Sequence, residues 1–443
     1  MSEYIHEEAR NLEVFGEADV VVVGGGPAGT TAAVCAARNG ANVLMLERYG
    51  HLGGMATGGI VIALPYLSHG SNTQELTGVN QEWLDRLDLY GGALHPPKDE
   101  VGSSNPKVIG KWNKYFACVM EGKVRQTAYA DPEILKIVLN DMVEEAGVAV
   151  CLHSWGCRPL VGDGEVNGVV FESKEGRKAV LGKIVIDCTG DGDIFANAGA
   201  QFEADIDMNL RSANMAVVYR LGNVDFLEWA NFLEVEPKKS QEVRAKLQEI
   251  AGFSAVLMPS PRNDVCWLNN WVSGKDCLKV KDLTYVEFAV RKTVRPVIEF
   301  LRAEAPGFKN AFLIDTAPQI GTRSSRRLKG EYRLSMDDMK EGKRFEDTVA
   351  LIPSMRPAIV PSVIHFPYRA LVPEKVNGLL VAGRCFSSES AANNITNLIP
   401  HCVAMGEAAG TAAAIAIKSS VQPRNINIDT LVDTLKKQGV YLP

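Results

Sequence analysis

A glycine-rich segment near the N-terminus constrains the fold of this chain more than any other feature. Residues 20–23 are four valines, a β-branched run that predicts a buried parallel strand. Gly24, Gly26 and Gly29 follow with the spacing G-x-G-x-x-G. A tight turn, a close backbone approach and close helix packing each require a residue without a side chain there. Small residues continue as a helix, and residues 42–46 predict the next strand.

The surroundings of these glycines indicate what the turn binds. Glu47 ends the second strand, eighteen residues after Gly29. A carboxylate at that place can accept hydrogen bonds from both hydroxyls of an adenosine ribose. Strand, turn, helix, strand and acid occur together, which predicts a bound dinucleotide and not merely a βαβ core. A second glycine-rich loop, residues 50–59, indicates backbone that passes beside a flat or anionic group.

Composition narrows the function classes. The 443 residues are enough for two domains, and a net charge of −6 argues against nucleic acid as a partner. No run of 18 uninterrupted apolar residues predicts a membrane span, and the first residues lack the apolar segment of a secretory signal. The nine cysteines form no C-x-x-C pair and the seven histidines show no ligand spacing. We therefore expect reduced thiols, no metal site and a cytoplasmic location.

The rest of the chain reads as further strands and helices around this opening unit. Asp131 and Pro132 begin a helix, and strands are expected at residues 148–152 and in an antiparallel pair at 166–172 and 178–185. Other expected elements are a polar arm at 1–17, an amphipathic helix at 81–89, a mixed domain at 209–349, a buried strand at 378–382 and a helix of small residues at 402–418.

Five segments together resemble a known family. They are the opening unit with its second glycine loop, IDCTGDGD, APQIGTRSSRRLKGEY, FPYRALVP, and LLVAGRCFSS followed by HCVAMGEAAGTAAA. The chain resembles the FAD-dependent oxidoreductases of the glutathione-reductase structural class, and more closely a bacterial subgroup known only by that general activity. The resemblance covers residues 19–418.

The resemblance implies an α/β fold in which a second domain interrupts the cofactor domain. The first would be a Rossmann-type FAD-binding domain, a parallel sheet with a small antiparallel crossover, at residues 1–75, 119–208 and 350–443. The second would be an inserted mixed α+β substrate or cap domain at residues 76–118 and 209–349.

The resemblance also implies which residues hold the FAD. The implied set is Gly24, Gly26, Pro27, Ala28 and Gly29 at the pyrophosphate, Glu47 and Arg48 at the adenosine ribose, Gly53, Gly54, Met55, Ala56 and Thr57 along the ribityl chain and flavin, Cys151 beside the adenine, Gly190 and Asp191 near the pyrophosphate, Gly383 and Arg384 at the ribityl or phosphate portion, and His401 and Cys402 at the flavin. Many flavoproteins of the wider class carry Gly-Asp where this chain has Gly383-Arg384.

The last helix has a physical role that does not depend on the family. His401 and Cys402 lie where the helix should begin, so free N–H groups and the positive end of the dipole would face the flavin pyrimidine edge. Negative charge on the reduced flavin would be stabilised there. Attachment of the FAD to His51 is an alternative that its spacing from the glycine pair disfavours, and we expect a non-covalent cofactor.

Candidates for catalysis lie outside the opening unit. Arg323, Arg326 and Arg327 could bind a substrate carboxylate, or form ion pairs with Glu331 and neighbouring acids. His365 and His401 could exchange protons near neutral pH, or be structural. The polar loop that carries Asn393, Asn394 and Asn397 could bind substrate or flavin, and relatives commonly have small residues at the asparagine pair. Our candidates for catalysis are His401, His365, Arg323 and Asn394.

These features favour one function and leave two others open. We expect an FAD-dependent dehydrogenase or oxidase that takes a hydride from a small or medium organic substrate onto the flavin N5. The alternatives are a fumarate-reductase-like reductase of an activated C=C bond, and a non-catalytic flavin-binding subunit. A second dinucleotide fingerprint is lacking, so oxygen, a quinone or a protein carrier is the expected electron partner. A homodimer is the expected assembly on general grounds.

Overall fold

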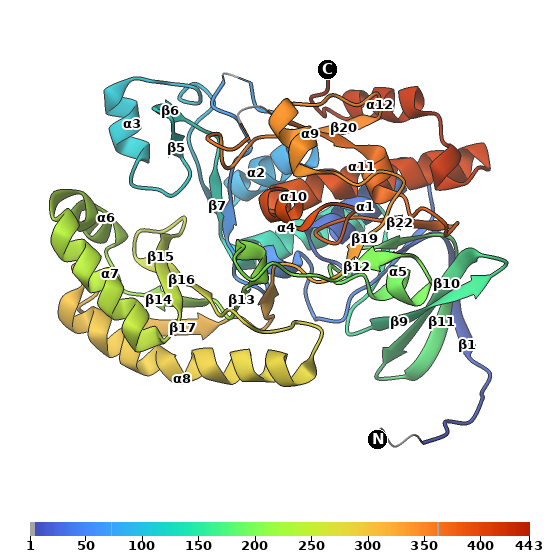
Figure 1. The fold of residues 1–443 in the computed structure, drawn as a ribbon, viewed down its shortest axis with the longest axis horizontal. Coiled ribbons are helices and arrows are strands. Elements are labelled where there is room, and N and C mark those ends of the chain that lie inside the picture. Colours follow the sequence, from blue (N-terminus) through green and yellow to red (C-terminus); the bar gives the residue numbers. More distant parts are fainter. Residues whose placement is uncertain (1–4, 72, 361–362) are drawn as a thin grey trace.

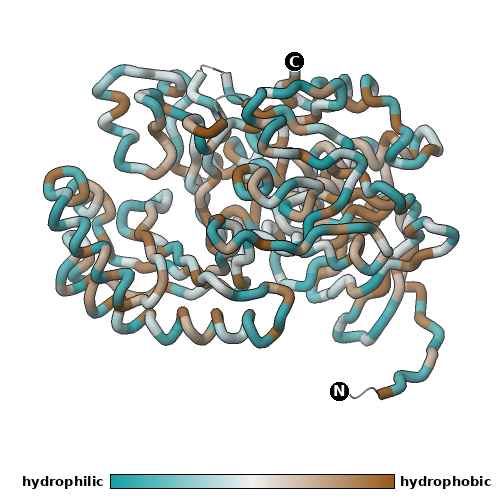
Figure 2. The backbone as a smooth tube through the Cα atoms, viewed as in Figure 1, coloured by the Kyte–Doolittle hydropathy of each residue, from teal (hydrophilic) through white to brown (hydrophobic). Residues whose placement is uncertain are grey.

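The structure, a computed structural model, describes residues 5–71, 73–360 and 363–443. Figure 1 shows a central sheet surrounded by helices, with a second sheet and three helices projecting to one side. Hydrophobic segments gather where the central sheet lies (Figure 2).

A seven-stranded sheet forms the core of the cofactor-side unit. Its strand order is β8-β2-β1-β11-β10-β9, with β22 also beside β11. The strands are β1 (Glu13–Val23), β2 (Val43–Leu46), β8 (Ala149–Cys151), β9 (Trp155–Gly162), β10 (Glu165–Ser173), β11 (Gly176–Asp187) and β22 (Leu379–Val381). Strands β8, β2, β1, β11 and β22 pair in parallel, whereas β9 and β10 pair antiparallel. This arrangement confirms the predicted α/β fold with an antiparallel crossover.

The helices that belong to the same hydrophobic cluster as this sheet include α1 (Pro27–Arg38), α2 (Val79–Leu89), α4 (Pro132–Glu145), α11 (Ile399–Ser419) and α12 (Ile428–Lys437). Asp131 caps α4 by accepting hydrogen bonds from the N–H groups of Glu133 and Ile134, as its sequence predicts. Helix α2 was expected in the inserted domain. Its buried side chains instead pack in the cluster of α1 and α11.

The projecting unit carries its own hydrophobic cluster. A four-stranded antiparallel sheet, β15-β16-β14-β17, packs with three helices (Figure 1). The elements are β14 (Tyr219–Gly222), β15 (Ser254–Pro259), β16 (Val265–Trp271), β17 (Phe312–Thr316), α6 (Phe226–Val235), α7 (Pro237–Ala251) and α8 (Val280–Glu304). We call this unit the cap. The exact domain boundaries remain our proposal.

The other elements of the described chain are short. The strands are β3 (Ala63–Leu64), β4 (Ala93–Leu94), β5 (Val119–Met120), β6 (Lys123–Val124), β7 (Ala128–Ala130), β12 (Phe202–Glu203), β13 (Met215–Ala216), β18 (Gly321–Thr322), β19 (Arg327–Leu328), β20 (Thr348–Ile352) and β21 (Ile364–Pro367). The helices are α3 (Pro106–Trp112), α5 (Asp193–Asn197), α9 (Met336–Glu341) and α10 (Ser390–Thr396), with 3-10 turns η1 (Gly54–Ala56), η2 (Arg211–Ala213), η3 (Tyr368–Leu371) and η4 (Pro423–Asn425).

The predicted polar arm is partly wrong. Residues 13–18 are not an arm, because they extend β1 and pair with residues 178–182 of β11. Ladder hydrogen bonds use the backbone and need no apolar side chain. Phe15 also packs edge-to-face on Phe171 of β10, with ring centroids 5.5 Å apart.

Within the described ranges, no single helix has the length and apolarity to cross a membrane. Helices α10 and α11, which meet at 97°, pass that test only when they are taken together.

Helices α1 and α11 pack together through glycine and alanine. A Cβ atom on Gly406 would lie 2.1 Å from the carbonyl oxygen of Ala28, and one on Gly410 would lie 2.1 Å from that of Ala32. Both neighbours are backbone atoms that cannot move aside. The contact therefore fixes α11 against the helix that follows the glycine turn, and it requires glycine at both positions.

Gly410→Ala should lower the apparent melting temperature, equivalent to about 1–3 kcal/mol, because the added methyl group overpacks this helix contact. Gly110→Ala is the matched control: Gly110 lies exposed in α3, and its Cβ would meet no atom within 4 Å. That change should raise stability by about 0.5–1 kcal/mol through helix propensity. Thermal unfolding of both variants checks the prediction, and equal effects would contradict it.

Candidate functional site

The three glycines of the turn between β1 and α1 meet different constraints. Gly24 has a φ of +97°, and a Cβ there would lie 2.6 Å from the carbonyl oxygen of Cys188. A Cβ on Gly29 would lie 1.7 Å from the carbonyl oxygen of Gly24. A Cβ on Gly26 would meet nothing within 4 Å. Gly24 and Gly29 are thus required by the fold, whereas Gly26 leaves an open space at the start of α1, where a pyrophosphate fits.

The second glycine loop lies directly on this turn. The N–H of Gly53 donates to the carbonyl oxygen of Gly25 at 2.8 Å. A Cβ on Gly54 would lie 2.9 Å from the Cα of Gly26. The segment that follows the cap contacts the same loop, because the N–H of Gln319 donates to the carbonyl oxygen of Gly58 at 3.2 Å. The predicted loop, including Met55, Ala56 and Thr57, therefore lies between the turn and the cap.

Glu47 is held by backbone groups at the end of β2. Its Oε2 accepts from the N–H of Gly25 at 2.6 Å, and its Oε1 accepts from the N–H of Tyr49 at 2.7 Å. Burial raises the pKa of this carboxyl group. The N–H of Glu47 donates to the carbonyl oxygen of Cys151, which places β8 beside the acid as predicted. Arg48 is exposed, with its guanidinium 4.9 Å from the ring centroid of Tyr49.

Asp187, which the sequence reasoning did not select, organises the turn after β11. Its carboxylate accepts from the N–H and hydroxyl of Thr189 and from the N–H groups of Ile194 and Phe195, at 2.7–3.0 Å. Burial raises its pKa to about 6. This acid sets the conformation of the loop that carries Gly190. The sequence feature that could have identified Asp187 is an acid at the end of an apolar strand.

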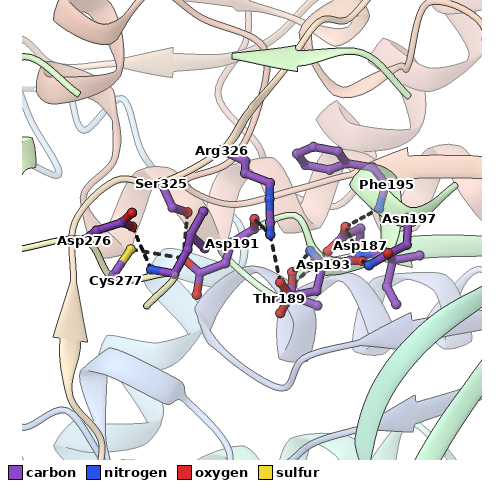
Figure 3. A network of polar contacts seen from close by, with 12 residues as sticks. Asp187, Thr189, Asp191, Asp193, Phe195, Asn197, Asp276, Cys277, Ser325 and Arg326 are labelled. Atoms are coloured by element: carbon purple, nitrogen blue, oxygen red, sulfur yellow. Dashed lines mark hydrogen bonds and ion pairs between the residues drawn. The ribbon is translucent and has the colours of Figure 1, made fainter. Parts of the chain in front are cut away.

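Asp191 joins that turn to the segment that carries Ser325 and Arg326 (Figure 3), and it also contacts Arg384 of the C-terminal segment. Its Oδ1 accepts from Ser325 Oγ and Arg384 Nη2, each at 2.6 Å. Burial opposes ionisation, but the charge of Arg384 and these hydrogen bonds hold the pKa of Asp191 below its usual range. Arg384 Nη1 is buried without a partner. The predicted residues Gly190, Asp191, Gly383 and Arg384 thus meet at one place.

The structure separates the three arginines of the basic run. Arg326 pairs with Asp193 at 3.0 Å, and the fully buried Arg327 pairs with Asp205 at 2.7 Å. Glu331, the partner considered from the sequence, pairs with Arg424 instead. No carboxylate of the described residues lies within ion-pair distance of Arg323. The structural explanation therefore holds for two arginines and not for the third.

The asparagine loop positions these groups. Asn397 Nδ2 donates to the carbonyl oxygen of Arg323 at 3.0 Å, and its Oδ1 accepts from Arg211 Nη2 at 2.7 Å. Arg211 Nη2 also donates to the carbonyl oxygen of Asn394 at 2.5 Å. Asn393 Nδ2 donates to the carbonyl oxygen of Arg384 at 2.8 Å. The side chains of Asn393 and Asn397 are thus bound to protein and act as supports.

His401 lies in the first turn of α11 and is fully buried. The N–H of Leu398 lies 3.4 Å from its Nδ1, a hydrogen bond with the backbone of Thr396 also acts on the ring, and Nε2 has no partner. Burial lowers its pKa to about 3. His401 is therefore neutral at physiological pH, which argues against the proton exchange near neutral pH that the sequence left open for this residue.

Two other histidines considered from the sequence are His365 and His51. His365 is on β21, in the ribbon that β20 and β21 form, with Nδ1 3.5 Å from Thr348 Oγ1. Burial and then Arg344 lower its pKa. None of the contacts recorded for it joins Arg323, Asn394 or His401. His51 stacks on Tyr49, with ring centroids 5.4 Å apart.

Two polar residues near the glycine loops and α11 were not selected from the sequence. Arg211 comes from η2, in a segment without a motif, and Gln319 precedes the basic run. Gln319 Oε1 and Arg211 Nε are both buried without partners. All nine cysteines are free. The described part of the chain contains no group of three or more His, Cys, Asp or Glu side chains that could hold a metal ion.

Comparison with known proteins assigns the family. The family model described as FAD dependent oxidoreductase matches residues 19–355 and 358–435. The chain belongs to this family. It is therefore an enzyme, an FAD-dependent oxidoreductase. The open space at Gly26 and the unpartnered Nη1 of Arg384 fit the cofactor of this family.

Individual relatives match less of the chain. Digeranylgeranylglycerophospholipid reductases 2 and 1 of Methanopyrus kandleri are 30% identical over 177 residues and 31% identical over 178 residues. Each match covers 39% of this chain and 38% or 40% of the relative, so the chain spans about two-fifths of the curated relatives. A geranylgeranyl bacteriochlorophyll reductase-like protein of Thermoplasma acidophilum has 17% identity and a TM-score of 0.50, covering 95% of this chain and 83% of that one. That likeness shows a shared fold.

Gly26→Val should abolish FAD binding and leave the apoprotein folded. The Cβ of the valine would enter the open space at the start of α1, where it meets no protein atom within 4 Å. Gly24→Ala should instead lower the melting temperature of the apoprotein, since its φ is positive and its methyl group would meet the carbonyl of Cys188. FAD titration and thermal unfolding of both apoproteins check this. Normal FAD affinity in Gly26→Val would contradict the placement of the pyrophosphate.

His401 should make the apoprotein less stable as the pH falls. Its folded pKa of about 3 lies below the ordinary 6.5, so only the unfolded chain gains a proton as the pH falls through 6.5. That linkage removes about 1.4 kcal/mol between pH 7.5 and 5.5. His401→Gln, neutral throughout, should lack this loss. Unfolding of both proteins across that range checks it, and parallel pH profiles would contradict a buried neutral His401.

Proposed function

We propose that this enzyme binds FAD non-covalently and oxidises a small or medium organic substrate as a dehydrogenase or oxidase. The observation that carries the proposal is a set of buried polar atoms without protein partners around the start of α11. They include His401 Nε2, Arg323 Nε and Arg211 Nε. Buried polar groups in folded proteins are nearly always hydrogen-bonded, so such a set supports a site completed by bound molecules.

Different residues of the chain would hold different parts of FAD. Gly26 and the following N–H groups of α1 would bind the pyrophosphate, with Arg384 adding positive charge. Glu47 would accept hydrogen bonds from the ribose, and the loop from Gly53 to Thr57 would follow the ribityl chain. When bound, FAD supplies a hydride acceptor at its N5.

The start of α11 would face the flavin pyrimidine edge. Pro400 has no N–H, and the first N–H groups of a helix lack intrahelical acceptors. They carry the positive end of the helix dipole, which stabilises nearby negative charge. His401 Nε2, buried without a partner, would add a polar atom there. The N–H of Cys402 already donates to the carbonyl oxygen of Leu398 at 3.0 Å, so the free N–H groups of this helix start precede residue 402. This arrangement supports stabilisation of a reduced, negatively charged cofactor at the start of α11.

A second candidate reaction is reduction of an activated C=C bond. Arg323 and Arg211, without carboxylate partners, favour a substrate with an acidic group, which activates an adjacent double bond. The relatives whose names describe them as reductases also support a reductive reaction. For either reaction we propose oxygen, a quinone or a protein carrier as the electron partner, a homodimer as the assembly and the cytoplasm as the location.

Anaerobic spectroscopy of the purified holoenzyme tests the proposal. The flavin should leave the protein on acid precipitation, because attachment is non-covalent. An organic donor should bleach the oxidised flavin if the enzyme is a dehydrogenase or oxidase, and an enoate should reoxidise the reduced flavin if it is a reductase. Purified protein that holds FAD but responds to neither class of compound would favour a non-catalytic subunit and contradict the proposal.

A further inference from the structure

The cap and the start of α11 enclose two arginines without counter-charges. Arg323 follows β18, and Arg211 lies in η2, just before β13. Strands β13 and β18 pair with each other, and Asn397 binds both the backbone of Arg323 and the side chain of Arg211. Within the described residues no acidic side chain pairs with either one. Two positive charges therefore share one buried location.

Burial of such charges is costly without a partner. A buried ion loses several kcal/mol of hydration, which folded proteins usually recover through a paired charge. Burial lowers the pKa of Arg323 to about 9, with Arg211 adding repulsion. Burial lowers the pKa of Arg211 to about 10, with Arg356 adding repulsion. A ligand that brings negative charge would relieve this cost.

The neighbouring groups also offer donors. Trp271, on β16 of the cap, has a buried Nε1 without a partner, and the guanidinium of Arg323 lies 5.8 Å from its ring centroid. His401 Nε2 is a further buried polar atom without a partner, and Arg211 acts electrostatically on that histidine. Asn269, also on β16, has a buried Oδ1 without a partner. A carboxylate, with two acceptor oxygens, matches this donor-rich surface.

The position links these donors to the cofactor loop. Gly321 of β18 packs on Met55, since a Cβ there would lie 2.9 Å from the Met55 Cε. The pyrophosphate is proposed at Gly26. Arg211 contacts Asn394, Asn397 and Asn214, and Arg323 contacts Asn397 and Trp271, so the glycine turn holds neither arginine.

We infer that Arg211 and Arg323, with Trp271 beside them, form a subsite for a carboxylate group of the substrate. The inference rests on the proposed function, because it places the substrate beside the flavin, and it narrows the substrates to organic acids. The two arginines bind and orient the acid, and Asn397 is a positioning residue that holds both.

Ligand titration of the holoenzyme tests this subsite. The probes are acetate, crotonate, succinate and benzoate, each compared with its neutral amide, and the readout is the visible spectrum of the oxidised flavin. At least one carboxylate should bind at least tenfold more tightly than its amide. Arg323→Met and Arg211→Met should each weaken that binding about 10- to 100-fold, the value of a charge-assisted hydrogen bond. Arg323→Lys should retain part of it.

Arg220→Met is the matched control. Arg220 lies on β14 of the same cap sheet but pairs with Asp315 at 2.5 Å. This variant should bind carboxylates as the wild type does, and its apoprotein should melt at a lower temperature because Asp315 loses its partner. The apoprotein of Arg323→Met should melt at the wild-type temperature or above it, because an unpaired charge is removed. Arg211→Met also loses the hydrogen bonds from Nη2 to Asn394 and Asn397, so its melting temperature should fall. A fall in Arg323→Met equal to that of Arg220→Met would make Arg323 structural and overturn the inference.

Further measurements distinguish failure of the carboxylate subsite from failure of the proposed function. The reduction potential of the ligand-free holoenzyme should be unchanged in both methionine variants, and a lower potential would assign the arginines to the flavin itself. Equal binding of carboxylates and amides, or no response to any of the four acids, would overturn the subsite while FAD binding stays intact. Failure of the wild-type apoprotein to bind FAD would instead overturn the proposed function.

Discussion

The close approach of backbone to backbone around α1 is the constraint on which the rest of this structure depends. Gly29 touches the carbonyl of Gly24 at the N-terminal end of the helix, and Gly406 and Gly410 bring α11 against the carbonyls of Ala28 and Ala32. These contacts have no room for a methyl group. They bring the start of α1 and the start of α11 into one rigid unit, although almost four hundred residues separate them in the sequence.

The functional arrangement follows from this unit. One helix start offers an open space beside Gly26, and the other offers the buried, neutral His401. Asp187 and Asp191 fix the loop between them and tie it to Arg384 and Ser325. The segments around β13 and β18 then add Arg211 and Arg323, which have no acid to pair with among the described residues. The glycine contacts thus fix the backbone, whereas several polar atoms around them have no protein partner.

Local patterns predicted much of the fold. The strand-turn-helix unit, the Asp131 cap and the antiparallel crossover all depend on residues close in sequence, and each was found as expected. Residues 13–18 escaped prediction because ladder pairing with β11 is long-range and leaves no side-chain pattern. Helix α2 was placed with the wrong neighbours, because amphipathic spacing shows that a face is buried but not what covers it.

The candidate site was harder to predict than the fold, because the charge and protonation of its side chains depend on the residues around them. Three arginines in one basic run looked equivalent, yet Asp193 and Asp205 neutralise two of them and leave Arg323. His401 was expected to titrate near neutrality, but full burial keeps it neutral. Arg211 lies in no motif, and its role follows only from its neighbours Asn394 and Asn397. The FAD-binding role of the predicted residues remains a proposal that their geometry supports.

An experimental structure of the holoenzyme with bound FAD tests the central claim most directly. The account predicts the pyrophosphate over Gly26, the ribityl chain along the loop from Gly53 to Thr57, and the flavin O2 within hydrogen-bond distance of the first N–H groups of α11, those that precede Cys402. A flavin whose pyrimidine edge lies away from the start of α11, or a pyrophosphate away from Gly26, would contradict it.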